Sequence, residues 1–98
     1  MQASVEIREP DGVVLRGDLR FATVTAIRSR LERLIATGNS HCAVDFAAVK
    51  SVDSSALSLW LCCQREAQRH GVTLEARRVP EELMSIARLV GLESLFDA

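Results

Sequence analysis

Hydrophobic residues in this chain switch between strand-like and helix-like spacing several times, and the order of the switches restricts the fold. Polar and apolar residues alternate over 4–8, turn-forming residues follow at 9–12, and residues 13–16 resume the extended pattern. Two short strands around Pro10-Asp11-Gly12 predict a hairpin. We therefore expect the sheet to open with an antiparallel pair of strands.

Helical spacing begins at Thr23. The apolar stripe of this segment consists of Val24, Ile27, Leu31, Leu34 and Ile35, while arginines and Glu32 occupy most of the opposite face. Gly38-Asn39 predicts the C-terminal end of the helix. Residues 41–46 then form a short run that is apolar on both sides, which is typical of an inner strand covered by helices.

The remaining sequence repeats this change of spacing. It predicts a second helix over about 55–70, ended by Gly71, and a strand over 72–76. Pro80 is expected at the first position of a third helix, whose apolar stripe consists of Leu83, Ile86, Ala87 and Val90. The apolar residues within 92–96 are expected to fold back as a tail.

The predicted element order is therefore β-β-α-β-α-β-α. An initial hairpin followed by right-handed β-α-β crossovers gives an α/β fold with a mixed sheet and with helices packed mainly on one face. The length of 98 residues and the apolar fraction of 48% fit one small domain over 1–98.

Charge and hydropathy exclude several classes of partner. Twelve Lys and Arg residues balance 13 Asp and Glu residues, so the sequence offers no overall attraction for nucleic acid. No stretch is long and apolar enough for direct membrane insertion, and residues 1–6 lack the features of a secretory signal. We therefore expect a cytoplasmic location.

The residue types that carry chemistry are sparse. Three cysteines without a Cys-x-x-Cys pair favour free thiols, and metal binding with His41 or His70 is the less favoured alternative. A Ser-His-Asp set can be assembled on paper from Ser54, Asp53 or Asp45 and one of these histidines, but no phosphate loop or nucleophile motif accompanies it. We expect no catalytic residue, no metal and no cofactor.

Residues 49–60 are the most informative part of the chain. Asp53, Ser54 and Ser55 precede a helix whose first backbone N–H groups lack partners within the helix. One of these side chains is expected to cap the helix. Another serine can be exposed for phosphorylation or partner contact, because a phosphate there would be stabilised by the same N–H groups. Both roles can hold for different serines.

Four segments carry a resemblance that covers nearly all of the chain. They are Leu15-Arg16-Gly17-Asp18-Leu19, Val44-Asp45-Phe46, Val52-Asp53-Ser54-Ser55-Ala56-Leu57 and His70-Gly71-Val72-Thr73-Leu74. Through them the chain resembles the STAS domain family, which includes the anti-sigma-factor antagonists. In such antagonists the serine after the aspartate accepts phosphate, and Ser54 matches that position. The chain departs from the family at Ala56, where members usually carry Gly.

Within this family the chain is most similar to the MlaB branch, the small STAS subunits of Mla-type phospholipid ABC transporters, which maintain outer-membrane lipid asymmetry. The resemblance implies a non-catalytic subunit that binds the cytoplasmic ABC ATPase (MlaF-like) and is peripheral to the inner membrane through that partner. It also implies that Ser54 and the helix after it meet the ATPase. The alternative is an anti-sigma-factor antagonist, switched when an anti-sigma factor kinase phosphorylates Ser54.

The second helix has its own pattern. Its apolar side chains Ala56, Leu57, Leu59, Trp60, Leu61 and Cys63 cover an arc of roughly 200°, whereas one core stripe needs about 100°. We expect the surplus flank to serve either as a docking surface or as additional core, and we favour Trp60 as a core residue over Trp60 as an interface anchor. The residues predicted to contact a partner are Asp53, Ser54, Ser55, Leu57, Ser58, Leu61 and Arg65.

Overall fold

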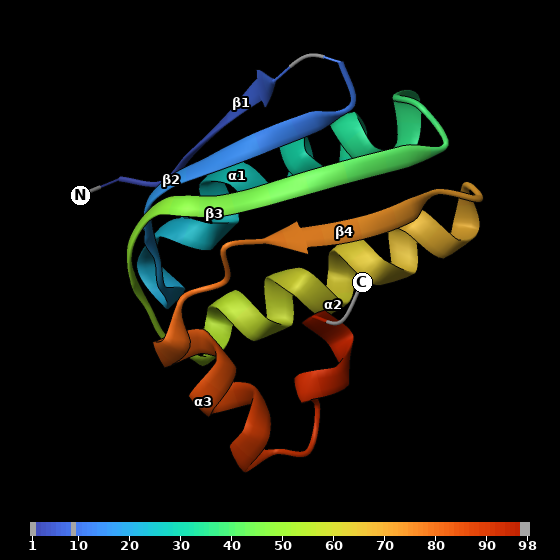
Figure 1. The fold of residues 1–98 in the computed structure, drawn as a ribbon. Coiled ribbons are helices and arrows are strands. Elements are labelled where there is room, and N and C mark those ends of the chain that lie inside the picture. The colour runs from blue at the N-terminus through green and yellow to red at the C-terminus, as the bar shows by residue number, and fades with distance from the viewer. Residues whose placement is uncertain (1, 9, 97–98) are drawn as a thin grey trace.

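The computed structural model describes residues 2–8 and 10–96 of the chain. In chain order the elements are β1 (Ser4–Arg8), β2 (Gly12–Leu19), α1 (Phe21–Thr37), β3 (His41–Val52), α2 (Ser54–Arg69), β4 (Thr73–Arg77), α3 (Glu81–Leu89) and the 3-10 helix η1 (Glu93–Phe96) (Figure 1). The predicted order of strands and helices is confirmed.

The four strands form one sheet in the order β1-β2-β3-β4. β1 pairs antiparallel with β2, and β2, β3 and β4 run parallel to one another. In Figure 1, α1 and α2 lie together behind the strands, and α3 lies beyond the end of β4. The expected mixed sheet, with its initial hairpin and with helices mainly on one face, is confirmed.

β3 is longer than predicted. It continues to Val52, so residues 49–52 belong to a strand rather than to a loop before the second helix. The reason is pairing with β2, which also extends beyond its predicted end and aligns Leu19 with Val52. Irregularities in register after Val14 and after Gly17 allow this ladder to continue.

The irregular backbone at Gly17, inside β2, depends on the absence of a side chain. Its φ is +88°, and an added Cβ would lie 2.1 Å from the carbonyl oxygen of Gln2. Only glycine adopts this conformation and also permits the N-terminal segment to pass so close. The glycine of the Arg16-Gly17-Asp18 motif therefore has a structural role.

α1 begins at Phe21, two residues before its predicted start. The N–H of Arg20 donates to the Thr23 hydroxyl at 3.0 Å, so the helix start is fixed by a residue outside the apolar stripe. α1 ends before Gly38 as expected, but Gly38 is extended, with φ −90° and ψ −155°, rather than left-handed.

An aromatic cluster joins the C-terminal tail to the core. Trp60 stacks on Phe96 with ring centroids 5.5 Å apart, and Phe46 meets Trp60 edge-on at 5.6 Å. The Trp60 indole N–H donates to the carbonyl oxygen of Leu95 at 2.7 Å. The tail therefore folds back over α2, as predicted.

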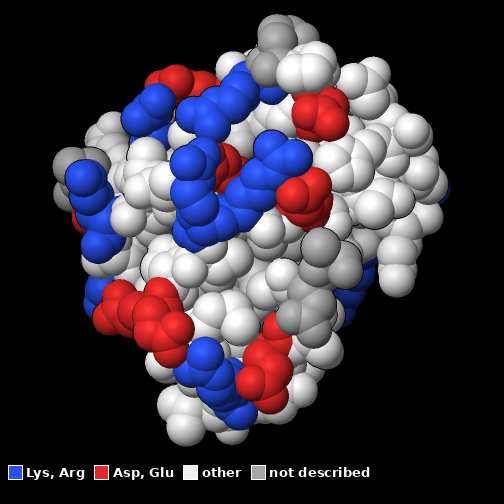
Figure 2. All heavy atoms as spheres, in the orientation of Figure 1, with Lys and Arg blue, Asp and Glu red and all other residues white. Residues whose placement is uncertain are grey.

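Charged side chains cover the sheet face opposite the helices. Asp45 is only 3% exposed, and Arg8 donates to it at 2.7 Å. Arg78 donates to both of its oxygens, and this hydrogen bonding lowers the pKa of Asp45 to about 2. Figure 2 shows arginine and acidic side chains crowded over the strands on this face. Val14 and Ala43 are buried without belonging to the helix-side core.

Candidate partner-binding site

Asp53 is the residue that caps α2. Its Oδ1 accepts from the N–H of Ser55 at 2.8 Å, and its Oδ2 accepts from the N–H of Phe21 at 3.0 Å. Partial burial raises the pKa of Asp53, but these hydrogen bonds outweigh that effect and the pKa is lowered. One carboxylate therefore serves the N-termini of two helices, and the predicted capping role falls to Asp53 rather than to a serine.

This division of roles leaves Ser54 exposed as the first residue of α2, whereas Ser55 is half-buried. Ala56, which stands where STAS domains usually have Gly, is 1% exposed and packs into the core. Its methyl group therefore points away from the surface on which Ser54 lies.

Ser54 begins a stripe along the outer side of α2. Helical spacing places Ser54, Ser58, Leu61 and Arg65 on one face. Ser54, Ser58 and Arg65 are exposed, and Leu61 is half-buried. We call these four residues the α2 stripe. Four of the seven predicted contact residues therefore share one accessible face.

Leu57 does not belong to that face. It is 6% exposed and lies in the core, so it is not accessible for partner contact as predicted. Most of the predicted apolar arc of α2 is likewise part of the core, because Ala56, Leu59, Trp60 and Cys63 are buried, whereas Leu61 is half-buried and lies on the α2 stripe. Phe96 of η1 and Leu83 of α3 belong to the same buried cluster, so this arc serves as additional core except at Leu61.

A groove of about 270 Å³ runs between α1 and α2 beside the stripe. Its lining is Phe21, Val24, Thr25, Arg28, Ser55, Ser58, Leu59 and Cys62. Phe21 is 82% exposed and was not singled out by the sequence. The available signal was a large aromatic residue at a helix start, outside the apolar stripe of that helix.

Two helix N-termini and two arginines surround the Asp53 carboxylate at this end of the molecule. The two helices are parallel because each connects parallel strands, so their N-termini meet at Asp53. Neither helix has an acidic residue in its first turn. Arg20 donates to the carbonyl oxygen of Val52 at 3.1 Å, and Arg28 lines the groove.

The Ser-His-Asp set that the sequence allows is not assembled. His41 begins β3 and Ser54 lies just beyond its other end, so the whole 12-residue strand, roughly 36 Å of extended chain, lies between them. His70 follows the last residue of α2, roughly 24 Å from Ser54 along the helix. Neither imidazole can therefore act as a base toward the Ser54 hydroxyl.

The three cysteines are free thiols, two of them buried. Burial is the main cause that raises the pKa of Cys63, so this thiol stays protonated. Within residues 2–8 and 10–96, no group of three or more His, Cys, Asp or Glu side chains is placed to hold a metal ion. In the same residues, no helix combines the length and apolar character needed to span a bilayer.

The chain matches a known family over nearly its whole length. The family described as "Mlab, STAS domain" matches residues 5–97. A search of curated proteins finds no match.

Solved structures share the fold. The anti-sigma factor antagonist SpoIIAA in its unphosphorylated form has a TM-score of 0.67 at 21% identity, covering 89% of this chain and 82% of that chain. The Bacillus cell fate determinant SpoIIAA in the phosphorylated form has a TM-score of 0.69 at 22% identity, covering 92% and 84%. A structure of Mglu has a TM-score of 0.56 at 29% identity and covers 80% of this chain but 19% of that chain. Because the family match spans almost the whole chain and the fold agrees with that of SpoIIAA, this chain belongs to the MlaB-type family of STAS domains.

Proposed function

We propose that residues 1–98 form one STAS domain that acts by binding and not by catalysis. Its partner is the ABC ATPase subunit of an Mla-type phospholipid transporter, which maintains outer-membrane lipid asymmetry. The domain supports assembly or activity of that complex from the cytoplasmic side and is held at the inner membrane by its partner. The match to the MlaB-type family supports this partner class.

One observation carries the proposal. Because Asp53 caps both helices, Ser54 is free of the capping role and is exposed at the start of the α2 stripe. An exposed hydroxyl beside an apolar groove suits a protein interface, which combines hydrogen bonds with buried apolar contacts. Ser54, Ser58, Leu61 and Arg65 are the proposed contacts on α2. Ser55 adds a contact inside the groove, and Phe21 adds one from α1.

The same geometry favours a second candidate, an anti-sigma-factor antagonist controlled by phosphorylation of Ser54. The SpoIIAA structures show that this fold exists in phosphorylated and unphosphorylated forms. A phosphate on Ser54 would lie at two helix N-termini and would add about two negative charges to the surface. A kinase-like anti-sigma factor would then be the partner.

The test is affinity purification of the tagged chain from membranes of its own cells, followed by identification of bound proteins. We expect an ABC ATPase in the wild-type sample and its loss with Ser58→Arg, which places a long charged side chain in the groove. The matched control is Ser85→Arg, an exposed serine of α3. Absence of an ABC ATPase, or equal loss with both variants, would contradict the proposal. An anti-sigma factor in its place, together with phosphate on Ser54 in the intact mass, would support the second candidate.

A further inference from the structure

β1 lies at one edge of the four-stranded sheet, with β2 as its neighbour on the inner side. Figure 1 shows it along the margin of the molecule, and Ser4, Glu6, Ile7 and Arg8 are exposed. Alternate residues of such a strand direct their backbone N–H and C=O groups away from the sheet. β1 contains no proline, and its pairing with β2 keeps one register over all five residues. The edge is therefore regular enough to accept another strand.

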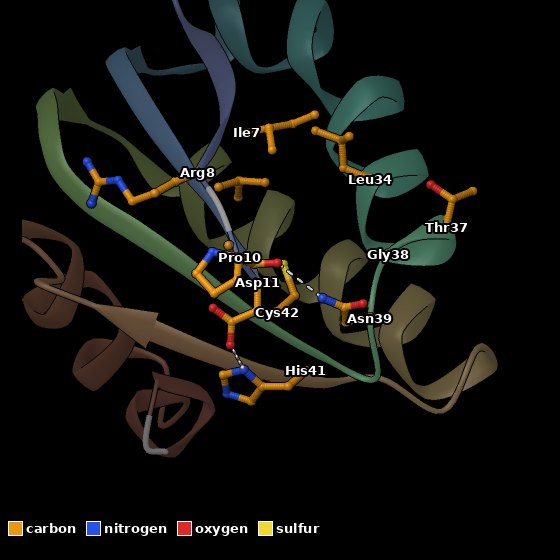
Figure 3. Close-up of a pocket in the computed structure, with 12 residues that line it drawn as sticks. Ile7, Arg8, Pro10, Asp11, Leu34, Thr37, Gly38, Asn39, His41 and Cys42 are labelled. Atoms are coloured by element: carbon orange, nitrogen blue, oxygen red, sulfur yellow. Dashed lines mark hydrogen bonds and ion pairs between the residues drawn. The ribbon is translucent and has the colours of Figure 1, made fainter.

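Ile7 is the feature that distinguishes this edge. Val5 is 6% exposed and faces the helices, and Ile7, two positions later in the same strand, lies on that face. Ile7 is nevertheless 58% exposed. Its side chain points toward the half-buried Leu34 of α1 (Figure 3), and both residues line a cavity of about 290 Å³. Covering Ile7 would remove this apolar surface from water.

The opposite face of β1 carries two charges of opposite sign. Glu6 and Arg8 flank Ile7, and the Arg8 side chain points away from Ile7 in Figure 3. Each already has one partner within the chain, because Arg16 donates to Glu6 Oε1 at 3.0 Å and Arg8 donates to Asp45 at 2.7 Å. The side chains of Glu6 and Arg8 are nevertheless 56% and 51% exposed, so both can make a further ion pair.

These charges select one way for a second copy to pair. In an antiparallel pair of identical strands centred on Ile7, the Ile7 side chains of the two copies face each other. The same register places Glu6 of one copy opposite Arg8 of the other, twice by symmetry, on the face away from the helices. Centring the pair on Glu6 or on Arg8 would place like charges opposite each other. β1 is therefore complementary to itself in one register.

The opposite edge of the sheet lacks this combination. β4 carries Glu75 and Arg77 two positions apart, but these side chains are joined to each other by hydrogen bonds of 2.8 and 3.2 Å. Ala76 between them is small and half-buried. Pairing at β4 would therefore cover little apolar surface, and its two charges already neutralise each other. The observations favour β1 as the edge that accepts another strand.

We infer that two copies of this chain associate through β1, with the two strands antiparallel and Ile7 at the two-fold axis. The sheets of both copies then form one continuous sheet. The interface is small and rests on one aliphatic pair and two ion pairs, so association occurs at high protein concentration. The α2 stripe belongs to the helix that joins β3 to β4, away from this edge, so the inference is independent of the proposed transporter partner.

The test is sedimentation velocity of the purified chain between about 10 μM and about 1 mM, where we expect the mean mass to rise from that of one chain toward that of two. Ile7→Arg places like charges at the axis and should weaken the association at least about tenfold, with an unchanged melting temperature because Ile7 is exposed. Leu89→Arg makes the same change at an 86% exposed residue of α3 and should associate as the wild type does. The mass of one chain at every concentration, or equal effects of the two variants, would overturn the inference.

Cysteine cross-linking tests the register separately from the affinity. Glu6→Cys in one copy and Arg8→Cys in the other would place the two thiols on directly opposite residues, within the Cα separation of about 4.4–6.8 Å that a disulfide requires. The mixed pair also keeps the other contact between Glu6 and Arg8. Under mild oxidation we expect the mixture to give a disulfide between positions 6 and 8 in excess over the disulfide-linked dimers of either variant alone. Wild-type chain oxidised in parallel controls for the half-buried Cys62. Equal yields from the mixture and from the single variants would mean that the copies meet at random, and the inference would fail.

Discussion

The backbone N–H of Phe21 donates a 3.0 Å hydrogen bond to Asp53, which lies 32 positions later in the chain. Because Asp53 also accepts from the N–H of Ser55 at 2.8 Å, one carboxylate begins both α1 and α2. Asp53 therefore links the start of α1, with the exposed Phe21, to the start of the α2 stripe.

Replacing Asp53 should destabilise the fold at two helices at once. Asp53→Ala removes two capping acceptors, each worth about 1 kcal/mol, so we expect a loss of about 2 kcal/mol in the free energy of unfolding in urea. Ser54→Ala is the control, because the serine is exposed, and should change the stability by less than about 0.5 kcal/mol. Equal losses from the two variants would show that Ser54 shares the cap.

Phe21 should contribute to the affinity for the partner and not to the stability of the fold. Since its side chain is 82% exposed, Phe21→Ser should leave the melting temperature nearly unchanged and weaken binding of the co-purified ATPase about tenfold. Leu89→Ser is the matched control, an apolar residue of α3 that is 86% exposed. Affinity measured by calorimetry for both variants decides whether the groove is part of the interface.

Lowering the pH should weaken the ion pairs of Asp45 with Arg8 and Arg78 on the sheet face opposite the helices. The Arg78 guanidinium is the main cause that lowers the pKa of Asp45 from its ordinary value of 3.8 to about 2. The pKa of Asp45 is lower in the folded protein than in the unfolded chain. The ionised Asp45 therefore contributes fully to the free energy of unfolding above about pH 4, and this contribution is lost as the pH falls toward 2.

Melting temperatures between pH 2 and pH 7 test this contribution. Asp45→Asn should lower the stability by about 2 kcal/mol at pH 7, with a smaller loss at pH 2. Ser85→Ala, which removes no titratable group from the surface of α3, should follow the wild-type pH profile. A constant difference between Asp45→Asn and wild type across this range would exclude ionisation of Asp45 as the cause.

The C-terminal tail should contribute strongly to stability through its aromatic contact. Phe96→Ala removes a ring that is 7% exposed and stacks on Trp60, so we expect a loss of about 3 kcal/mol and a red shift of Trp60 fluorescence. Leu89→Ala should change neither quantity. An unshifted emission maximum in Phe96→Ala would mean that Trp60 is covered by other residues.

Two glycines with positive φ should differ in their tolerance of alanine. At Gly17 an added Cβ meets the carbonyl oxygen of Gln2 at 2.1 Å, whereas at Gly71 nothing lies within 4 Å. Gly71→Ala should cost about 1 kcal/mol from backbone strain alone, and Gly17→Ala should cost clearly more. The free energies of unfolding of both variants in urea separate the cost of a positive φ from the cost of the steric contact with Gln2.

The order of elements followed from the sequence because periodicity is a property of neighbouring residues. The alternation over 4–8 and the stripe of Val24, Ile27 and Leu31 report which side of a strand or helix meets the core. Asp53 and Ser54 could be recognised as a helix start for the same local reason.

The site itself was decided by contacts between distant segments. The full length of β3 depends on pairing with β2, and the burial of Leu57 depends on packing within the shared core. The groove beside Phe21 exists because α1 and α2 pack in the shared core and Asp53 joins their N-terminal ends. Asp45 is buried because Arg8 and Arg78 reach it from β1 and from beyond β4. The sequence by itself determined the elements and the residue types at the start of α2, whereas the tertiary structure decided which of those residues are exposed, because burial depends on what the rest of the chain places against them.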